Sequence, residues 1–480
     1  MHGNLSSTSP GGYVVDTPYP DTFFRELSPA WLNYVAALNG VGVRDLDSGF
    51  TYLELGCGLG SSVVTNAGAY PLAVFHACDI NPEHIEHARA RASVFGIDNV
   101  EFHQCGFEAL RNAAMPMFDF IVAHGVYSWV DWQTRHAIRR LVRDYLNPGG
   151  LLYLSYNALP GRAYELPLRK LLVELAAEDA QYDAQDATTR AARALRSLRS
   201  LAGQRWRFLE ENPACVAAIG AYTQAPAAYL AHEYLNRAWE PFYCVDVADQ
   251  LQETGVVYVG SATLADNHAQ LLVDEATWRS VAQLTTQRQR RLALDFARNQ
   301  QFRRDVFWRP RSQSLGRGEP LDSRLVGCAA DPHELRYEVR VPRGVLRLQE
   351  SFVQRLQTLL ANGPIAIGAA VSELGRSVAQ GDESRRNLLY LVAAGALVPC
   401  AKALSRASPA PERQPASPSI TRILHHCVEH DVECVLPSQL LGNGVRIKPA
   451  EAAAVSAWLT TAGSPDSPLV LRLRYSGILR

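Results

Sequence analysis

In residues 51–60, TYLELGCGLG, an apolar segment typical of a buried β-strand leads into three glycines at alternate positions. Glycine has no Cβ, so the backbone can turn tightly there and come close to a ligand. A helix that follows such a turn presents free backbone N–H groups at its N-terminus. Asp79 stands 25 residues after Glu54, at the end of a second expected strand, where a carboxylate can accept the hydroxyls of a ribose. This stretch predicts a nucleotide-type ligand at the carboxyl edge of a sheet.

The glycine spacing distinguishes two kinds of nucleotide site. A dinucleotide fingerprint, G-x-G-x-x-G, would need glycine at position 61, which is occupied by Ser61. Glu54 precedes the first glycine, and its negative charge opposes a pyrophosphate but suits a ligand with a cationic amino group. The pattern therefore disfavours an NAD-type site.

Expected strands and helices alternate along the first third of the chain. The expected strands are residues 50–55, 72–79, 100–104, 118–124 and 151–156, with a further strand at 256–261. The expected helices begin at Ser28-Pro29, at Asn81-Pro82 (ending at Gly96), at Asp131 (ending before Pro148-Gly149-Gly150) and at Val245. This alternation predicts an α/β fold with a parallel sheet covered by helices on both faces.

The remaining segments complete the expected domain organisation. Residues 1–49 are expected to form an N-terminal segment that enters or covers the site, and residues 50–160 with 241–275 are expected to form the α/β core. Residues 161–240 are expected to be helical and to form an insertion or a cap over the sheet, and residues 276–400 are expected to be mainly helical and winged-helix-like. Residues 401–419 are a linker rich in Pro, Ser and Ala, and residues 420–480 form a small C-terminal segment.

Composition excludes several classes of protein. Of the 480 residues, 47% are apolar, and the net charge is −1, which disfavours a chain built to hold nucleic acid or coat an anionic membrane. The longest apolar runs, such as residues 388–398, are shorter than the ~20 residues that span a bilayer, so we expect no membrane insertion. The N-terminus has no secretory pattern, and the nine cysteines form no C-x-x-C pair, which favours a cytoplasmic protein.

Two local clusters have competing interpretations. Residues 288–311 hold eight arginines among aromatic residues, which suits nucleic acid or an acidic protein partner; pairing with the chain's own acids is the favoured interpretation. His426, His430 and Cys434 recur every four residues, as on one helical face, beside His425 and Cys427. A structural zinc site normally has a fourth ligand and a turn-based pair, so we interpret this segment as a half-buried helix and predict no metal site.

Longer stretches add a resemblance to a known family. They are Tyr19-Pro20-Asp21, residues 26–32 (ELSPAWL), 124–130 (HGVYSWV), 155–161 (SYNALPG) and 232–236 (HEYLN). With the glycine stretch, they resemble the class I S-adenosylmethionine-dependent methyltransferases, in a bacterial subgroup that carries a methyltransferase regulatory domain. Characterised members are similar to rickettsial lysine methyltransferases of outer-membrane proteins. The resemblance covers roughly residues 13–400 and, more weakly, 436–462, and it implies a Rossmann-like class I methyltransferase sheet.

The resemblance implies S-adenosyl-L-methionine as the cofactor and assigns residues to it. Glu54, Gly56, Gly58 and Gly60 would hold its methionine and ribose parts, with Cys57 beside them. Asp79 would take the ribose hydroxyls, Ile80 would pack on the adenine, Gly106 and Phe107 would approach the adenine edge, and His124 would lie beside the sulfonium. Many class I enzymes have an acid at the adenine edge, and Cys105-Gly106-Phe107 has none.

The resemblance also bears on the methyl acceptor. It implies N-methylation of lysine in a protein substrate, with His124, Tyr127, Trp129, Glu233 and Tyr19 as candidate catalytic residues. Strand four ends in His-Gly-Val-Tyr and not in Asp/Asn-Pro-Pro-Tyr, which disfavours planar nitrogens such as those of nucleic-acid bases. Two alternatives stay open: a metabolite, saccharide or natural product as acceptor, and a non-catalytic regulatory protein that binds the cofactor. A winged-helix-type unit often serves docking or dimerisation, so a homodimer also stays open.

Overall fold

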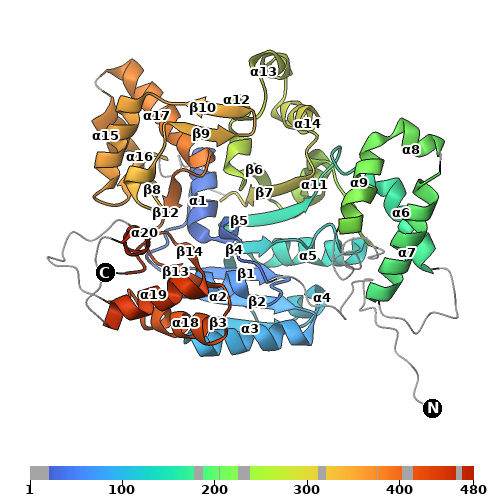
Figure 1. The fold of residues 1–480 in the computed structure, drawn as a ribbon, viewed down its shortest axis with the longest axis horizontal. Helices are drawn as coiled ribbons and strands as arrows, with labels where there is room; N and C mark the ends of the chain where they lie inside the picture. Colours follow the sequence, from blue (N-terminus) through green and yellow to red (C-terminus); the bar gives the residue numbers. More distant parts are fainter. Residues whose placement is uncertain are drawn as a thin grey trace.

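A seven-stranded mixed sheet forms the centre of the molecule, in the order β3-β2-β1-β4-β5-β7-β6 (Figure 1). The computed structural model describes residues 21–177, 187–204, 206–224, 238–311, 321–375, 377–402, 414–460 and 467–479. The strands are β1 Thr51–Leu55, β2 Val74–Asp79, β3 Val100–Gln104, β4 Phe118–Ala123, β5 Leu146–Asn157, β6 Val257–Ser261 and β7 Phe302–Trp308. β1 to β5 are parallel, as the sequence predicts, and β7 runs antiparallel to both β5 and β6.

The strand β7 corrects the expected end of the core. Residues 276–400 were expected to be mainly helical and separate from the sheet, but Phe302–Trp308 lies between β5 and β6. Its sequence, FRRDVFW, hides the period-2 pattern because two charged residues, Arg303 and Asp305, occupy buried positions of the strand. The catalytic sheet therefore extends beyond residue 275 to Trp308.

Helices cover both faces of the sheet. The helices η1 Arg25–Leu27, α1 Pro29–Leu38, α2 Ser61–Ala69 and α3 Pro82–Phe95 lie on one face; α4 Phe107–Arg111, α5 Trp132–Tyr145 and α11 Cys244–Gln252 lie on the other. The predicted caps are present: the Ser28 hydroxyl accepts from Trp31 N, and the Asn81 side chain accepts from Glu83 N. Gly96 ends α3 in the left-handed conformation, with φ 68°. The predicted doubly covered sheet is thus confirmed.

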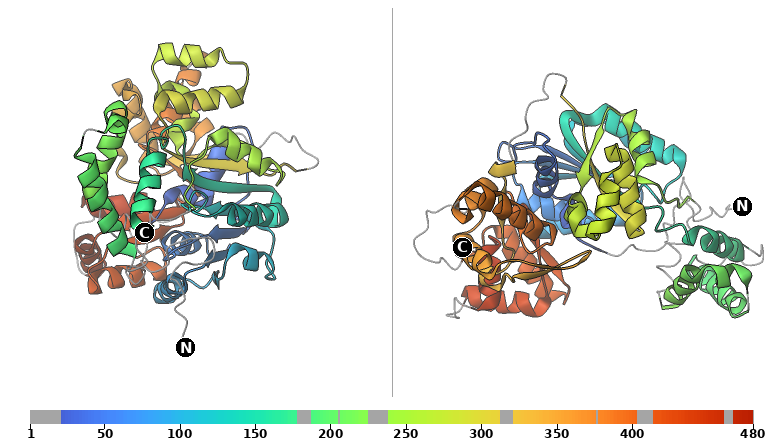
Figure 2. Two further views of the ribbon diagram at one scale, coloured as in Figure 1. Left: turned by 90° about the vertical axis from the view of Figure 1, so that its right-hand side faces the viewer. Right: turned by 90° about the horizontal axis from the view of Figure 1, so that it is seen from above.

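The helical insertion forms a unit beside the sheet. Its helices are α6 Glu165–Ala177, α7 Ala187–Ala202, α8 Arg207–Glu211 and α9 Pro213–Gln224. Their apolar side chains, including those of Leu168, Leu198 and Ile219, pack in a cluster of their own. Figures 1 and 2 show this unit at one edge of the molecule, so its described residues form an insertion and not a cap over the sheet, because their apolar face is already buried within the unit.

The second half of the chain adds helices and small sheets. The first elements are η3 Leu264–Asn267, α12 Ala269–Leu272, α13 Glu275–Ala282 and α14 Gln287–Arg298. After β7, they are followed by η4 Leu321–Ser323, β8 Leu325–Gly327, η5 Pro332–Glu334, β9 Glu338–Val341 and β10 Gly344–Arg347. Three longer helices follow, α15 Glu350–Leu360, α16 Ile367–Leu374 and α17 Val378–Ala393, with β11 Ile365–Ala366 between α15 and α16 and β12 Val398–Cys400 after α17. The helical character of this region is confirmed.

The C-terminal segment packs onto the catalytic core. It comprises α18 Pro418–Glu429, β13 Cys434–Ser438, β14 Asn443–Ile447, α19 Pro449–Thr460 and α20 Pro468–Tyr475. β13 and β14 contact α2, and α18 contacts α3, so the segment shares the hydrophobic cluster on that face of the sheet (Figure 1). None of the helices in the described residues combines the length and apolarity that crossing a bilayer requires.

Candidate active site

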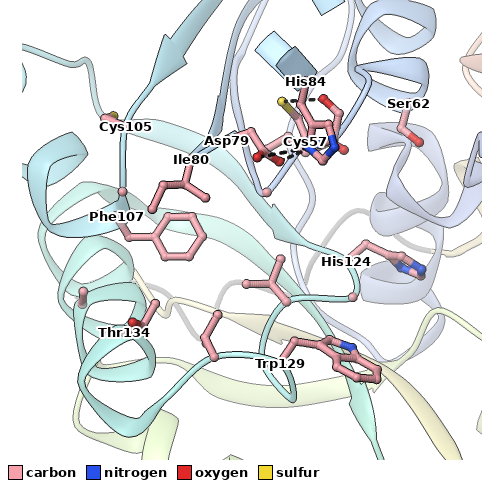
Figure 3. A pocket seen from close by; sticks show the side chains of 18 of the residues that line it. Cys57, Ser62, Asp79, Ile80, His84, Cys105, Phe107, His124, Trp129 and Thr134 are labelled. Carbon is pink, nitrogen blue, oxygen red and sulfur yellow. Dashed lines mark hydrogen bonds and ion pairs between the residues drawn. The ribbon is translucent and has the colours of Figure 1, made fainter. Parts of the chain in front are cut away.

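A cavity of about 580 Å³ lies at the carboxyl ends of β1, β2 and β4 and against the loop after β3. This edge is where open parallel sheets bind ligands. Figure 3 shows Ile80 and Phe107 together at one end of the cavity, with His124 and Trp129 at the other. The exposed residues Glu108, Ala109 and Gln133 also line the cavity, so it opens to solvent.

The glycine loop lines the cavity with backbone. Gly56, Gly58 and Gly60 all have positive φ (71°, 53° and 79°). A Cβ on Gly58 would meet no atom within 4 Å, because this residue faces the open cavity. A Cβ on Gly60 would lie 2.7 Å from that of Ala88, and Gly60 does not line the cavity. Gly60 therefore brings α2 close to α3, whereas Gly56, Cys57 and Gly58 face the ligand space.

Asp79 is fixed by backbone donors at the end of β2. Its Oδ2 accepts from Gly58 N at 2.9 Å, and its Oδ1 accepts from Asn81 N at 2.9 Å. His84 Nδ1 lies 3.3 Å from the same Oδ1, and both side chains line the cavity (Figure 3). A carboxylate has about four acceptor sites, so Asp79 keeps capacity for ligand hydroxyls.

Glu54 offers a buried carboxylate to the cavity. Its exposed fraction is 4%, and its Oε2 has no hydrogen-bond partner among the described residues. Burial raises the pKa of Glu54 to about 8, because a charged carboxylate without a partner is costly away from water. A cationic amino group in the cavity would remove this cost. The donor set thus fits a ligand that combines a ribose with an amino group, as S-adenosylmethionine does.

Comparisons with known proteins agree with this geometry. A family model described as a methyltransferase domain matches residues 46–207, and one described as a predicted methyltransferase regulatory domain matches residues 226–309. An uncharacterized protein of Synechocystis sp. is 32% identical over 359 residues, which are 74% of this chain and 70% of that protein. The chain belongs to the class I S-adenosylmethionine-dependent methyltransferases that carry a methyltransferase regulatory domain.

Solved structures of another protein share the fold of this methyltransferase over nearly the whole chain. PKMT2 from Rickettsia typhi has a TM-score of 0.65 and 17% sequence identity, and the match covers 96% of this chain and 100% of that one. The structure of PKMT2 in complex with AdoHcy matches over the same shares at 18% identity and the same TM-score. Carboxy-S-adenosyl-L-methionine synthase from Aeromonas hydrophila is 30% identical over 172 residues, which are 34% of this chain and 63% of that enzyme. The shared architecture with PKMT2 thus includes the segments outside the catalytic sheet.

His124 lies at the cavity end of β4, enclosed by aromatic rings. Its Nδ1 is 2.8 Å from the Tyr153 hydroxyl, and its ring centroid is 3.8 Å from that of Phe24. Burial, with a smaller effect of Arg304, lowers the pKa of His124 to about 3. The imidazole is therefore neutral at pH 7 and is a weak proton acceptor in this methyltransferase.

Tyr127 occupies a different place from the one expected. It does not line the cavity; its hydroxyl donates to Gln250 at 2.7 Å, and its ring packs against Phe242 on the far side of the loop. Arg139 donates to the same hydroxyl at 3.4 Å. Tyr127 thus ties the loop after β4 to α5 and α11. The stretch HGVYSWV could not reveal this, because the direction of each side chain depends on how the loop turns.

The remaining expected residues divide into two groups, and the cavity also has lining residues that were not expected. Trp129 lines the cavity, and so do the expected adenine neighbours Ile80, Gly106 and Phe107. Tyr19 and Glu233, with its neighbour His232, lie outside the described residues. Sequence reasoning missed Phe24, His84 and Thr134, which also line the cavity. His84 could have been found, since it lies on the first turn of the helix predicted to begin directly after Asp79.

Proposed function

We propose that this methyltransferase uses S-adenosylmethionine to methylate lysine side chains of a protein substrate. The observation that carries the choice of acceptor is that the cavity is also exposed beside His124: the exposed residue Asp21 lines it, on the same segment as Phe24, whose ring centroid lies 3.8 Å from that of His124. No described residue of the insertion lines or closes it. A rim of this kind can receive a side chain that projects from a large partner. The likeness of nearly the whole chain to a protein named PKMT2 supports the same choice.

Each part of the cofactor has a matching group in the cavity. Glu54 would pair with the amino group, Gly56, Cys57 and Gly58 would line the ribose and methionine part, and Asp79 would accept hydrogen bonds from the ribose hydroxyls. At the other end, Ile80, Gly106 and Phe107 would enclose the adenine, and no acid stands among residues 105–107 to accept from its amino group. When bound, the cofactor supplies a methyl group on a positively charged sulfur, which becomes a neutral thioether after transfer. Gly60 contributes by packing.

The aromatic residues at the cavity rim handle the acceptor nitrogen. A lysine ammonium has a pKa of about 10.4 and must lose a proton before its lone pair can attack. Phe24, His124 and Trp129 remove water from the entering amine, which favours its neutral form. Since the pKa of His124 is about 3, we assign it to holding and orienting the amine. The rim thereby aligns the nitrogen with the methyl group, which is the main source of rate in such a displacement.

The proposed compartment follows from the thiols. All nine cysteines fall within the described residues, and none forms a disulfide. A chain with nine free thiols, of which eight are buried, suits a reducing compartment. We therefore propose the cytoplasm as the place of action.

Labelling experiments test the acceptor. The purified full chain would be incubated with cofactor labelled in the methyl group and with bacterial lysate and cell-envelope fractions, and the products mapped by mass spectrometry. We expect methyl-lysine in one or a few proteins and no label with Glu54→Gln. Label confined to small molecules would instead support a metabolite acceptor. Failure of the wild-type chain to bind the cofactor in a calorimetric titration would support the non-catalytic regulatory protein.

A further inference from the structure

Three side chains with metal-binding atoms meet on the outer part of the sheet, outside the cavity. They are His76 on β2 and Glu101 and His103 on β3. The register pairs His76 with Glu101 and Cys78 with His103, so all three side chains project from the same face. None of them lines the cofactor cavity. The cluster is therefore separate from the proposed active site.

The separations within the cluster match the dimensions of a metal site. His76 Nδ1 lies 3.1 Å from His103 Nε2 and 3.8 Å from a carboxylate oxygen of Glu101, and His103 Nε2 lies 3.7 Å from the other oxygen. In a tetrahedral zinc site with bonds of about 2.1 Å, neighbouring ligand atoms are roughly 3.4 Å apart. The three groups can reach one ion with small side-chain rotations.

The surroundings hold the two imidazoles and leave the carboxylate free to move. The His76 side chain has an exposed fraction of 7% and packs edge-on against Phe118, and its ring stacks parallel to that of His103. The Glu101 side chain is 66% exposed. An ion can enter from solvent on the Glu101 side, where water can complete its coordination. The buried ring of His76 and the partly exposed ring of His103 provide preorganised nitrogen ligands.

We propose that His76, Glu101 and His103 bind a divalent transition-metal ion such as Zn²⁺. Two imidazole nitrogens and one carboxylate oxygen are ligands that zinc and its neighbours in the first transition row accept, with an open position for water. The ion would join the edge strand β3 to β2. In the metal-free protein, the two rings share a hydrogen bond of 3.1 Å. A bound ion would take the place of this hydrogen bond.

The histidine segment near the C-terminus is the competing location. Sequence analysis singled out His426, His430 and Cys434 and interpreted them as part of a helix. In the structure, the rings of His426 and His430 are 4.4 Å apart, but the neighbouring thiol of Cys427 donates to Val432 O. Among the described residues, the His76 cluster is the one group of three whose ligand atoms lie within 4.8 Å of one another. We therefore assign the ion to the sheet.

Titration with the metal alone tests the site in the full chain. Chelator-treated protein would be titrated with ZnCl₂ by calorimetry, and thermal unfolding would be recorded with and without Zn²⁺. We expect one ion per chain and a higher melting temperature, because an ion that binds only the native state stabilises it. Co²⁺ in place of Zn²⁺ should give the visible absorption of a four-coordinate site.

Variants locate the ion. Glu101→Gln and His103→Ala change partly exposed side chains, and each should weaken Zn²⁺ binding by about tenfold or more, while His87→Ala, at an exposed helix position, should leave it unchanged. Circular dichroism of the metal-free variants verifies that they fold. Unchanged stoichiometry and affinity in both cluster variants would overturn the proposal, as would loss of binding in His426→Ala alone. Absence of any binding to the wild-type chain at about 100 µM Zn²⁺ would overturn it as well.

Discussion

Glu54 belongs to the glycine motif in the sequence and is a buried acid of the cavity in the structure. An acid before a glycine loop opposes a pyrophosphate, and the burial of Glu54 with no hydrogen-bond partner for Oε2 among the described residues makes its charge costly in the ligand-free protein. The raised pKa means that most of the ligand-free protein carries a protonated Glu54 at pH 7. A cationic ligand selects the ionised form, so binding must release a proton.

This coupling predicts how cofactor affinity depends on pH. As pH rises from 6 towards 8, a growing fraction of Glu54 is ionised before binding, so the affinity should rise by up to about tenfold per pH unit and level off above pH 8. Glu54→Gln should weaken binding by about 10- to 100-fold and remove the pH dependence. Calorimetry in buffers of different ionisation enthalpy measures the released proton. The exposed acid Glu86 gives the control, Glu86→Gln, and a pH-independent affinity of the wild type would contradict the assignment.

The two glycines Gly58 and Gly60 look equivalent in sequence but differ in the structure. Both have positive φ, which costs an alanine about 1–2 kcal/mol. At Gly60 the new Cβ also meets Ala88, so Gly60→Ala should lower the free energy of unfolding by about 3 kcal/mol. At Gly58 the methyl group enters the cavity, so Gly58→Ala should lower it by about 1 kcal/mol and weaken cofactor binding more strongly than stability. Chemical denaturation and cofactor titration separate the two effects; equal behaviour of the variants would contradict this division.

At this scale, the motif allowed Glu54, Asp79, Gly56 and Gly58 to be placed in the site from the sequence, whereas Gly60 lies outside the cavity. Their positions follow from the end of a strand, which a local pattern reveals. The place of Tyr127 could not be predicted, because a loop residue one or two positions away from a site residue can point to the opposite side. Phe24 reaches the cavity from a segment remote in sequence, which no local pattern indicates.

At the scale of elements, the predictable parts were those with local start and stop signals. The helix α3 has Asn81 at its start and Gly96 at its end, and both act as the sequence indicates. The strand β7 was missed because its central sheet position is stabilised by charge pairing. Arg303 lies between Asp295 and Asp305, with its Nη1 and Nη2 atoms 2.6 and 2.8 Å from their oxygens, and all three side chains are buried. A pattern of apolar residues in the sequence cannot reveal a buried network of charged side chains.

The network predicts a large effect of one substitution. Arg303→Leu would leave the carboxylates of Asp295 and Asp305 buried without their cation, so the free energy of unfolding should fall by about 3–5 kcal/mol. Removing one of the two remaining negative charges with Asp295→Asn in the same chain should recover part of the loss. The exposed pair Arg207–Glu211 provides the comparison, since Arg207→Ala should leave stability unchanged within error. A loss of under about 1 kcal/mol for Arg303→Leu would show that β7 does not depend on the pair.

At the scale of the whole molecule, the C-terminal segment contacts the N-terminal residues that border the cavity. Arg446 on β14 donates to the carbonyl of Phe23 at 3.1 Å, and Phe24 N donates to the hydroxyl of Ser62 at 3.0 Å. Asp21 pairs with Arg91, and Asp21, Thr22 and Phe24 line the cavity. The C-terminal hairpin thereby fixes the segment that borders the ligand space. Sequence analysis treated residues 420–480 as a small separate segment, because contacts across 423 positions leave no local signal.

This contact predicts an effect on cofactor binding at a distance. Arg446→Ala removes the donor to Phe23, so residues 21–24 should be held less firmly, and cofactor affinity should fall a few-fold through the cost of ordering them on binding. The melting temperature should change little, because the side chain is at the surface. Glu433→Gln is the matched control: it removes the negative charge of the other partner of Arg446, at 3.1 Å, and leaves the bond to Phe23 in place. Equal affinities of the two variants would mean that the hairpin only stabilises the core, whereas a loss confined to Arg446→Ala would make the C-terminal segment part of the cofactor site.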